Sequence, residues 1–228
     1  MSGTITELLL AALAFCGAHF LLSSLPVRNA IVARIGEWPF RGLYSIVAVV
    51  SLIWLIRAYG NAPEIPLWAQ TSWARYFAVS VMPFSLILIV AGYLTRNPTM
   101  VGQERLLSAE HPAPGILKVT RHPALWGIAL WATAHVPANG DAASVIFFGT
   151  LGVLALGGAA HIDQRNRATR GQDWQRFAAA TSFFPFAGII LGRTRFAPGE
   201  VGWLRLLAGL GAFFALLYLH PWLIGVPA

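Results

Sequence analysis

Long apolar stretches separated by short polar ones dominate the chain. Six of them are long enough, or nearly so, to cross a hydrocarbon core of about 30 Å as helices. The fourth is the shortest and is expected to lie among the other helices instead of facing lipid along its whole length. The pattern predicts an all-α, polytopic membrane helix bundle that forms one domain over residues 1–228. The six segments are Ile5–Leu25, Phe40–Tyr59, Ala74–Leu94, Pro123–Pro137, Ala142–Ile162 and Gly202–Ile224.

The composition supports a surface that faces lipid. Of 228 residues, 57% are hydrophobic and 11% are charged, whereas soluble domains carry about 25% charged residues. The mean hydropathy is +0.63. The single cysteine, Cys16, excludes an intrachain disulfide and a thiolate zinc cluster. The net charge of +7 is attributed to membrane orientation, because no nucleic-acid-binding motif accompanies it.

The basic residues predict how the spans are oriented. With six spans, the first, third and fifth connections and the span ends beside them together hold fourteen basic residues, and the opposite side holds only Arg57 and Arg75. Cytoplasmic loops carry such an excess. We therefore expect these three connections in the cytoplasm of a bacterial inner membrane and both termini in the periplasm. The first segment lacks the basic start and the cleavage pattern of a signal peptide, so it is expected to stay as a helix.

Two stretches near the C-terminal part are predicted to lie at the membrane surface. Thr181–Arg193, "TSFFPFAGIILGR", is too short to span, and its aromatic and aliphatic residues suit an interfacial or re-entrant segment on the cytoplasmic face. The preceding residues 164–180, "QRNRATRGQDWQRFAAA", are expected to form a polar helix at the surface. Its arginines contact either lipid head groups or a substrate.

Two histidines inside the spans are candidate cofactor ligands, because a polar side chain at membrane depth is costly unless it is paired. His19 follows Gly17 and Ala18, whose small size lets a helix or a flat cofactor approach. His135 lies near the far end of the fourth span. Either imidazole alone is more often structural. For the pair, haem iron fits better than zinc or non-haem iron, which need thiolate clusters or nearby carboxylates. The predicted depths of the two differ by about 10 Å, so His122 or His161 is the alternative ligand.

Basic residues at the cytoplasmic boundary form a second group of candidates. Arg121 and His122 are expected to contact an anion, either a haem propionate or a phosphate. The alternative is lipid anchoring by Arg121 and a helix-cap role for His122. His161 and Arg165, four residues apart, share a helix face with Asp163 displaced from them. That face is predicted to seat propionates or an anionic substrate such as nitrite, and the alternative is a role in orientation alone.

The motifs "TRHPALWGIALWATAH", "AAHIDQRN" and "TSFFPFAGIILGR", in this order, resemble the NnrU family. That family includes, or is close to, the ζ-carotene isomerases of plants and cyanobacteria, and the likeness runs from "AHFLLSS" to about Arg193. The resemblance implies b-type haem with paired axial histidines, which by motif are His19 and His135. The isomerases have a cysteine where this chain has Ala132, which argues against a ligand-switching mechanism. Bacterial members are named for genes associated with nitrite and nitric-oxide metabolism.

A weaker resemblance links "RHPALWG" and "RFAAATSFFPF" to membrane methyltransferases that act on isoprenylcysteine or phospholipid. Their tyrosine and Glu-rich stretch are missing here. Three functions stay open: a haem protein acting on nitrogen oxides or isomerising a polyene, an S-adenosylmethionine-dependent methyltransferase, and a non-catalytic haem carrier or assembly partner of a respiratory complex. The expected partners are membrane lipid, haem and a small or lipid-soluble substrate. The sequence leaves the oligomeric state open.

Overall fold

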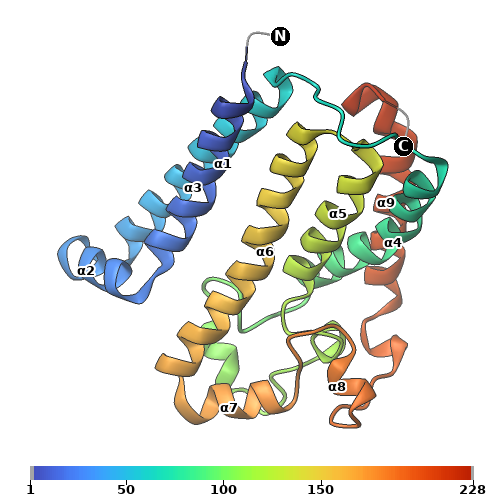
Figure 1. The fold of residues 1–228 in the computed structure, drawn as a ribbon. Coiled ribbons are helices and arrows are strands. Elements are labelled where there is room, and N and C mark those ends of the chain that lie inside the picture. The colour runs from blue at the N-terminus through green and yellow to red at the C-terminus, as the bar shows by residue number, and fades with distance from the viewer. Residues whose placement is uncertain (1–2, 227–228) are drawn as a thin grey trace.

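The computed structural model describes residues 3–226, which form long helices that pack side by side with short helices and loops gathered at one end (Figure 1). Within these residues the only bridge between extended segments joins Pro66 and Asp141. The predicted all-α bundle is confirmed. The helices are α1 (Ile5–Ser23), α2 (Leu25–Ile35), α3 (Glu37–Asn61), α4 (Ser72–Leu94), α5 (Pro123–Asn139), α6 (Ala142–Thr169), α7 (Gly171–Ala179), α8 (Ala187–Ile190) and α9 (Trp203–Ile224), with short 3-10 turns at Glu104–Ser108, Gly115–Lys118 and Pro198–Glu200.

Five helices, α1, α3, α4, α6 and α9, are long and apolar enough to cross a membrane. Their outer faces expose many large apolar side chains, as expected where lipid is the solvent. The fourth predicted span, α5, has 17 residues and is therefore about 25 Å long. It packs between α4 and α6 (Figure 1), as its short length predicts.

Helix α5 is held against α4 at backbone contact distance through two glycines. A Cβ atom on Gly92 would lie 2.7 Å from the amide nitrogen of Ala124, and one on Gly127 would lie 2.6 Å from the carbonyl oxygen of Ser85. The Ser85 hydroxyl donates to the Gly127 carbonyl at 2.7 Å. Any larger residue at either glycine would push the helices apart. The start of α5 is thus fixed in place, with Pro123 in its first turn as expected.

Three predictions about the polar connections need correction. Helix α6 continues to Thr169, past the predicted end at Ile162, so the expected surface helix over 164–180 is divided between the end of α6 and α7. Gly171, with φ of +50°, allows the sharp turn between them. Residues 25–35, treated as loop, form helix α2 with Pro26 in its first turn. The prediction missed these helical residues because it located helices by long apolar stretches, and these segments are polar.

The connections rich in arginine lie together at one end of the bundle, and α1 begins and α9 ends at the other (Figure 1). Assigning the basic end to the cytoplasm stays a prediction. At this end Trp174 and Phe177 of α7 are buried in an apolar core with the end of α4 and the 107–119 loop. The segment Thr181–Arg193 does not span: it forms a loop and α8, and it exposes Phe184, Ile190 and Leu191.

Candidate functional site

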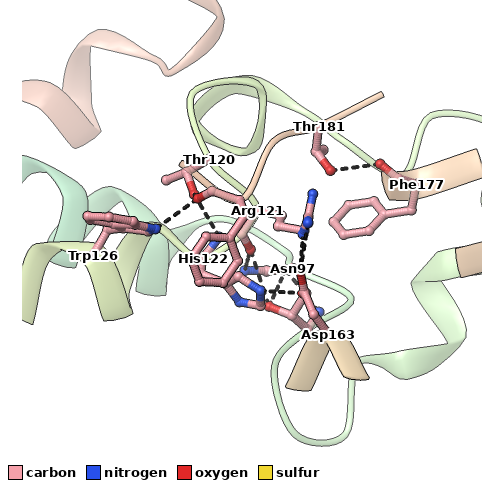
Figure 2. Close-up of polar contacts among 10 residues, drawn as sticks. Asn97, Thr120, Arg121, His122, Trp126, Asp163, Phe177 and Thr181 are labelled. Atoms are coloured by element: carbon pink, nitrogen blue, oxygen red, sulfur yellow. Dashed lines mark hydrogen bonds and ion pairs between the residues drawn. The ribbon is translucent and has the colours of Figure 1, made fainter. Parts of the chain in front are cut away.

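A buried carboxylate, Asp163 of α6, binds both polar side chains that precede α5 (Figure 2). Arg121 Nε donates to Asp163 Oδ2 at 2.8 Å, and Arg121 Nη2 lies 2.6 Å from the same oxygen. His122 Nε2 donates to the other oxygen, Oδ1, at 2.6 Å. Bonds of this kind to an ionised group are about twice as strong as neutral ones. The cluster therefore joins the start of α5 to the C-terminal part of α6.

Two loops enclose the cluster from either side. The carbonyl of Arg121 accepts bonds from Asn97 Nδ2 at 3.2 Å and from Thr99 Oγ1 at 3.3 Å. The amide of Arg121 donates to the carbonyl of Ser182 at 2.9 Å. Its guanidinium lies over the ring of Trp174, at 5.7 Å from the centroid, a contact that favours a cation. The 95–99 and 181–183 loops are thus built around the residues that begin α5.

The 181–186 loop is fastened to the same residues by its backbone. Thr120 Oγ1 and Trp126 Nε1 both donate to the carbonyl of Phe183, at 2.7 and 2.8 Å (Figure 2). The amide of Phe186 donates to the carbonyl of Val119 at 2.8 Å. Phe186 adopts φ of +64°, which a bulky residue accepts only when its surroundings impose it. The loop predicted to be interfacial is therefore also a structural cover of the cluster.

The burial of this cluster decides what it can do. The side chains of Arg121, Asp163 and His122 are 10%, 8% and 0% exposed. Burial lowers the pKa of His122 below its usual value despite the neighbouring carboxylate, so the imidazole is neutral. Its Nδ1 atom is buried and has no hydrogen-bond partner in the described part of the chain. A carboxylate–imidazole pair resembles a general base, but here the carboxylate is also paired with Arg121 and the imidazole is enclosed by loops. The cluster therefore has a structural role: it holds the start of α5 against α6 and the two loops.

Arg121 and His122 have an anionic partner within the chain, Asp163. Their expected contact with a haem propionate or a phosphate stays a prediction. Lipid anchoring by Arg121 is incompatible with its burial. His122 does occupy the N-cap position of α5, but its side chain makes no capping hydrogen bond.

His161 and Arg165 project from the other side of α6, as their spacing predicts. The His161 ring stacks on Phe20 of α1, and its Nδ1 lies 3.5 Å from the hydroxyl of Ser23. Arg165 is partly buried and interacts electrostatically with Tyr44, Arg28 and Glu104. Among residues 3–226 it forms no ion pair with a carboxylate. A partly buried guanidinium that forms no ion pair is available to an anion from outside the chain.

His19 and His135 share one arrangement in two places. His19 Nδ1 donates to the carbonyl of Phe15 at 2.7 Å, and His135 Nδ1 donates to the carbonyl of Trp131 at 2.8 Å. A carbonyl only accepts, so each bond places the ring proton on Nδ1 and leaves the Nε2 lone pair free. Metal-bound histidines are oriented in this way by a second partner. Each imidazole is thus ready to act as a ligand through Nε2.

The structure does not bring these two imidazoles into contact. The His19 ring packs edge-on against Tyr44 of α3, with centroids 5.5 Å apart, while the His135 ring packs on Phe148 of α6, with centroids 4.9 Å apart. A Cβ atom on Gly157 would touch Phe20, the neighbour of His19. Phe148 and Gly157 are separated by roughly 13 Å along α6. Shared ligation of one iron by His19 and His135 stays a prediction.

Sequence reasoning missed the carboxylate that organises the cluster. Asp163 was considered only as displaced from His161 and Arg165. Its signal was present, because a lone acidic residue at the end of an apolar helix needs a cationic or donor partner. Asn97 and Trp174 carried no comparable signal, since their roles arise from loops that meet only in the folded chain.

The residues of this cluster lie within a match to one protein family. A family model described as "NnrU protein" matches residues 7–228. The chain belongs to the NnrU family. The match covers α1 to α9 and so includes both histidines and the whole Asp163 cluster. No solved structure is significantly similar.

Curated relatives of this NnrU-family chain are plant proteins. It is 27% identical over 204 residues to "15-cis-zeta-carotene isomerase, chloroplastic" of Arabidopsis thaliana, covering 82% of this chain and 51% of the relative. It is 26% identical over 206 residues to the protein of the same name from Zea mays, with the same coverage. The chain therefore spans about half the length of the curated relatives it matches.

Proposed function

We propose that this NnrU-family protein binds b-type haem through His19 and His135 and isomerises a lipid-soluble polyene. The observation that carries the proposal is the shared arrangement of the two imidazoles, in which Nδ1 is bonded to a carbonyl and Nε2 is left free. The plant relatives are named as isomerases of a carotene, which gives the substrate class. Apolar outer faces would let such a substrate enter from the bilayer.

The residues present suit haem in their chemistry. Neutral imidazole is an axial ligand of haem iron, and the aromatic rings around His19 and His135 supply apolar walls. Arg165 and His161, on the α6 face that packs toward α1, would receive the propionates, since a planar guanidinium pairs well with carboxylate. When bound, the haem would supply a redox-active iron.

The chain's own residues would then have distinct tasks. His19 and His135 would hold the group, each kept in one tautomer by its carbonyl partner. Phe15, Tyr44 and Phe148 would exclude water from the imidazoles. The Asp163 cluster would fix α5 relative to α6 and so set the position of His135. Because Ala132 stands where the isomerase motif has cysteine, no thiolate from that position would take part.

Two other assignments receive less support. Methyl transfer would require the RHP histidine to meet its cofactor, but the side chain of His122 is 0% exposed and bonded to Asp163. Chemistry on nitrogen oxides rests on the bacterial family name, although an unpaired Arg165 would suit nitrite. For location we propose a bacterial inner membrane with the arginine-rich end in the cytoplasm, in accord with the charge bias.

Purification in detergent followed by absorption spectroscopy tests haem binding. We expect a low-spin b-type spectrum, because two imidazoles give a strong ligand field. His19→Ala and His135→Ala should each lower the haem content or make the haem high-spin. His111→Ala is the matched control, since its side chain is 90% exposed. Full low-spin haem in both single variants, or no haem in the unaltered protein, would refute the proposal.

The degree of loss also reports on whether one iron is shared. If both imidazoles bind the same haem, each single variant should lose all of its low-spin signal. If each binds a separate haem, each iron has one imidazole ligand, so the unaltered protein should already be high-spin and each variant should keep about half of its haem. Isomerase activity is assayed by chromatography of 15-cis-ζ-carotene incubated with the purified protein. A haem-loaded protein that leaves the cis isomer unchanged would separate a haem carrier from an isomerase.

A further inference from the structure

A hollow of about 270 Å³ lies where α4 ends and α9 begins, at the basic end of the bundle and apart from the histidines. Its walls include Leu94, Thr95 and Arg96 after α4 and Glu200 and Arg205 around the start of α9. Gly115 completes it from the intervening loop with φ of +53°. A Cβ atom there would lie 2.5 Å from the carbonyl oxygen of Glu200, so this close approach requires glycine.

Positive charge dominates the hollow. Arg205 is held in place by two carbonyls, with Nε donating to Leu94 at 3.2 Å and Nη1 donating to Val201 at 2.9 Å. Neither Arg205 nor Arg96 pairs with a carboxylate among residues 3–226. The one acidic wall residue, Glu200, is 2.6 Å from Lys118 Nζ, which balances its charge. The hollow thus keeps an excess of about two positive charges, one of them on an oriented guanidinium.

A buried hydroxyl without a partner gives independent evidence of a ligand. Thr95 is 5% exposed, and its Oγ1 has no hydrogen-bond partner among residues 3–226. Leaving such a group unpaired costs about 1–3 kcal/mol, and an acceptor oxygen bound in the hollow would remove that cost. A valine at this position would fill the same space without the cost, so its presence as threonine points to an acceptor.

Apolar residues flank the hollow where a lipid tail would run. Tyr93 and Leu94 are 58% and 55% exposed, and Trp203 and Leu204, in the first turn of α9, are 68% and 80% exposed. The start of α9 also directs the positive end of a helix dipole to this place. Basic pockets between spans on the cytoplasmic side bind anionic head groups.

We propose that this hollow binds a phosphate group, supplied by the head group of an anionic lipid. Arg205 and Arg96 provide the positive charge, and Thr95 Oγ1 donates a hydrogen bond to a phosphate oxygen. Leu94 and Leu204 contact the acyl chains. The site lies outside the proposed haem site, and it holds the end of α4 to the start of α9.

Native mass spectrometry of the protein purified in detergent tests the proposal. We expect one tightly retained phosphatidylglycerol per chain and at least tenfold weaker retention of phosphatidylcholine. Thr95→Val should weaken phosphatidylglycerol binding about tenfold, because a hydrogen bond to a charged group is lost. Arg205→Gln should weaken it at least as much. Arg193→Gln, which alters an exposed arginine at the same end, should change nothing.

Thr95→Val keeps the test decisive if Arg205→Gln fails to fold, because Thr95 Oγ1 makes no bond within the chain. Displacement of the lipid by millimolar inorganic phosphate would support the phosphate site but assign it to free phosphate. Equal retention of the two lipids without phosphate binding, or unchanged lipid and phosphate binding in Thr95→Val, would overturn it. Haem content is measured separately from lipid binding. A negative result for lipid binding therefore does not affect the proposed function, and absence of haem does not affect the lipid site.

Discussion

Two faces of α6 carry charged residues that are only two positions apart in the sequence but differ in how they are paired. On one face Asp163 is fully engaged by Arg121 and His122 and sealed by loops. On the other face His161 and Arg165 are partly exposed, and Arg165 forms no ion pair with a carboxylate among residues 3–226, although the charge of Glu104 acts on it from a greater distance. Both faces carry the polar residues that the "AAHIDQRN" motif supplies. Only one of them offers an atom to a ligand.

The difference shows how to separate structural charge from functional charge in a membrane protein. A buried ion is expensive unless partners within the chain compensate it, and once compensated it has little to offer a ligand. A partly buried ion without a partner keeps its capacity to bind. By this criterion the RHP motif is structural here, and the stretch around Arg165 is the place to search for a ligand. Three experiments examine the contrast, from the largest expected effect to the smallest.

Asp163→Asn should cause the largest change, a loss of about 3–5 kcal/mol in the free energy of unfolding, because it leaves Arg121 buried without a counter-ion. The measurement is the thermal unfolding midpoint in detergent. Asp173→Asn, on the more exposed helix α7 with a side chain 45% exposed, is the control and should cost less than about 1 kcal/mol. Equal shifts for the two variants would mean that the buried cluster does not stabilise the fold.

Acidification should have an intermediate effect through His122. Burial lowers its pKa in the folded state, whereas the unfolded chain titrates near the usual value of about 6.5. The unfolded state therefore binds the extra proton first, so stability is complete above about pH 6.5 and falls as the pH drops below it, by at most about 1.4 kcal/mol per pH unit. Unfolding midpoints at pH 7.5, 6.5 and 5.5 would measure this. His122→Gln should show a shallower slope, and an identical slope would contradict the assignment.

Arg165→Gln should leave stability within about 0.5 kcal/mol, because no ion pair is broken, yet it should weaken the binding of haem or another anion. Arg165→Lys keeps the charge but loses the planar fork of donors, so it should weaken anion binding without changing orientation. The readouts are haem content, unfolding midpoint and protease accessibility of the basic loops. Arg167→Gln, at an exposed neighbouring position, is the control. Unaltered haem binding in both Arg165 variants would leave Arg165 only an orientation role.

The helical period predicted which of these residues share a face. The spacing of His161 and Arg165, with Asp163 between them, gave the correct separation because side chains on a helix repeat every 3.6 residues. The same reasoning could not name the partner of Asp163. That partner lies about forty residues earlier in the chain, and only the packing of α5 on α6 brings it within 2.6 Å. Polar residues in an apolar chain predict that partners exist, while the packing decides which ones.

The sequence by itself determined the apolar spans, the collection of arginine at one end, the family motifs and the two histidines at membrane depth. These features depend on composition and on local periodicity, which are read one segment at a time. The tertiary structure alone decided that α5 packs between α4 and α6 and that Asp163 binds Arg121 and His122. It also decided that, among residues 3–226, Arg165 forms no ion pair with a carboxylate and Thr95 Oγ1 has no hydrogen-bond partner. Such pairings join segments that are distant in sequence. They depend on how closely the helices approach, which glycines such as Gly92 and Gly127 allow. The pattern of any one segment does not contain this information.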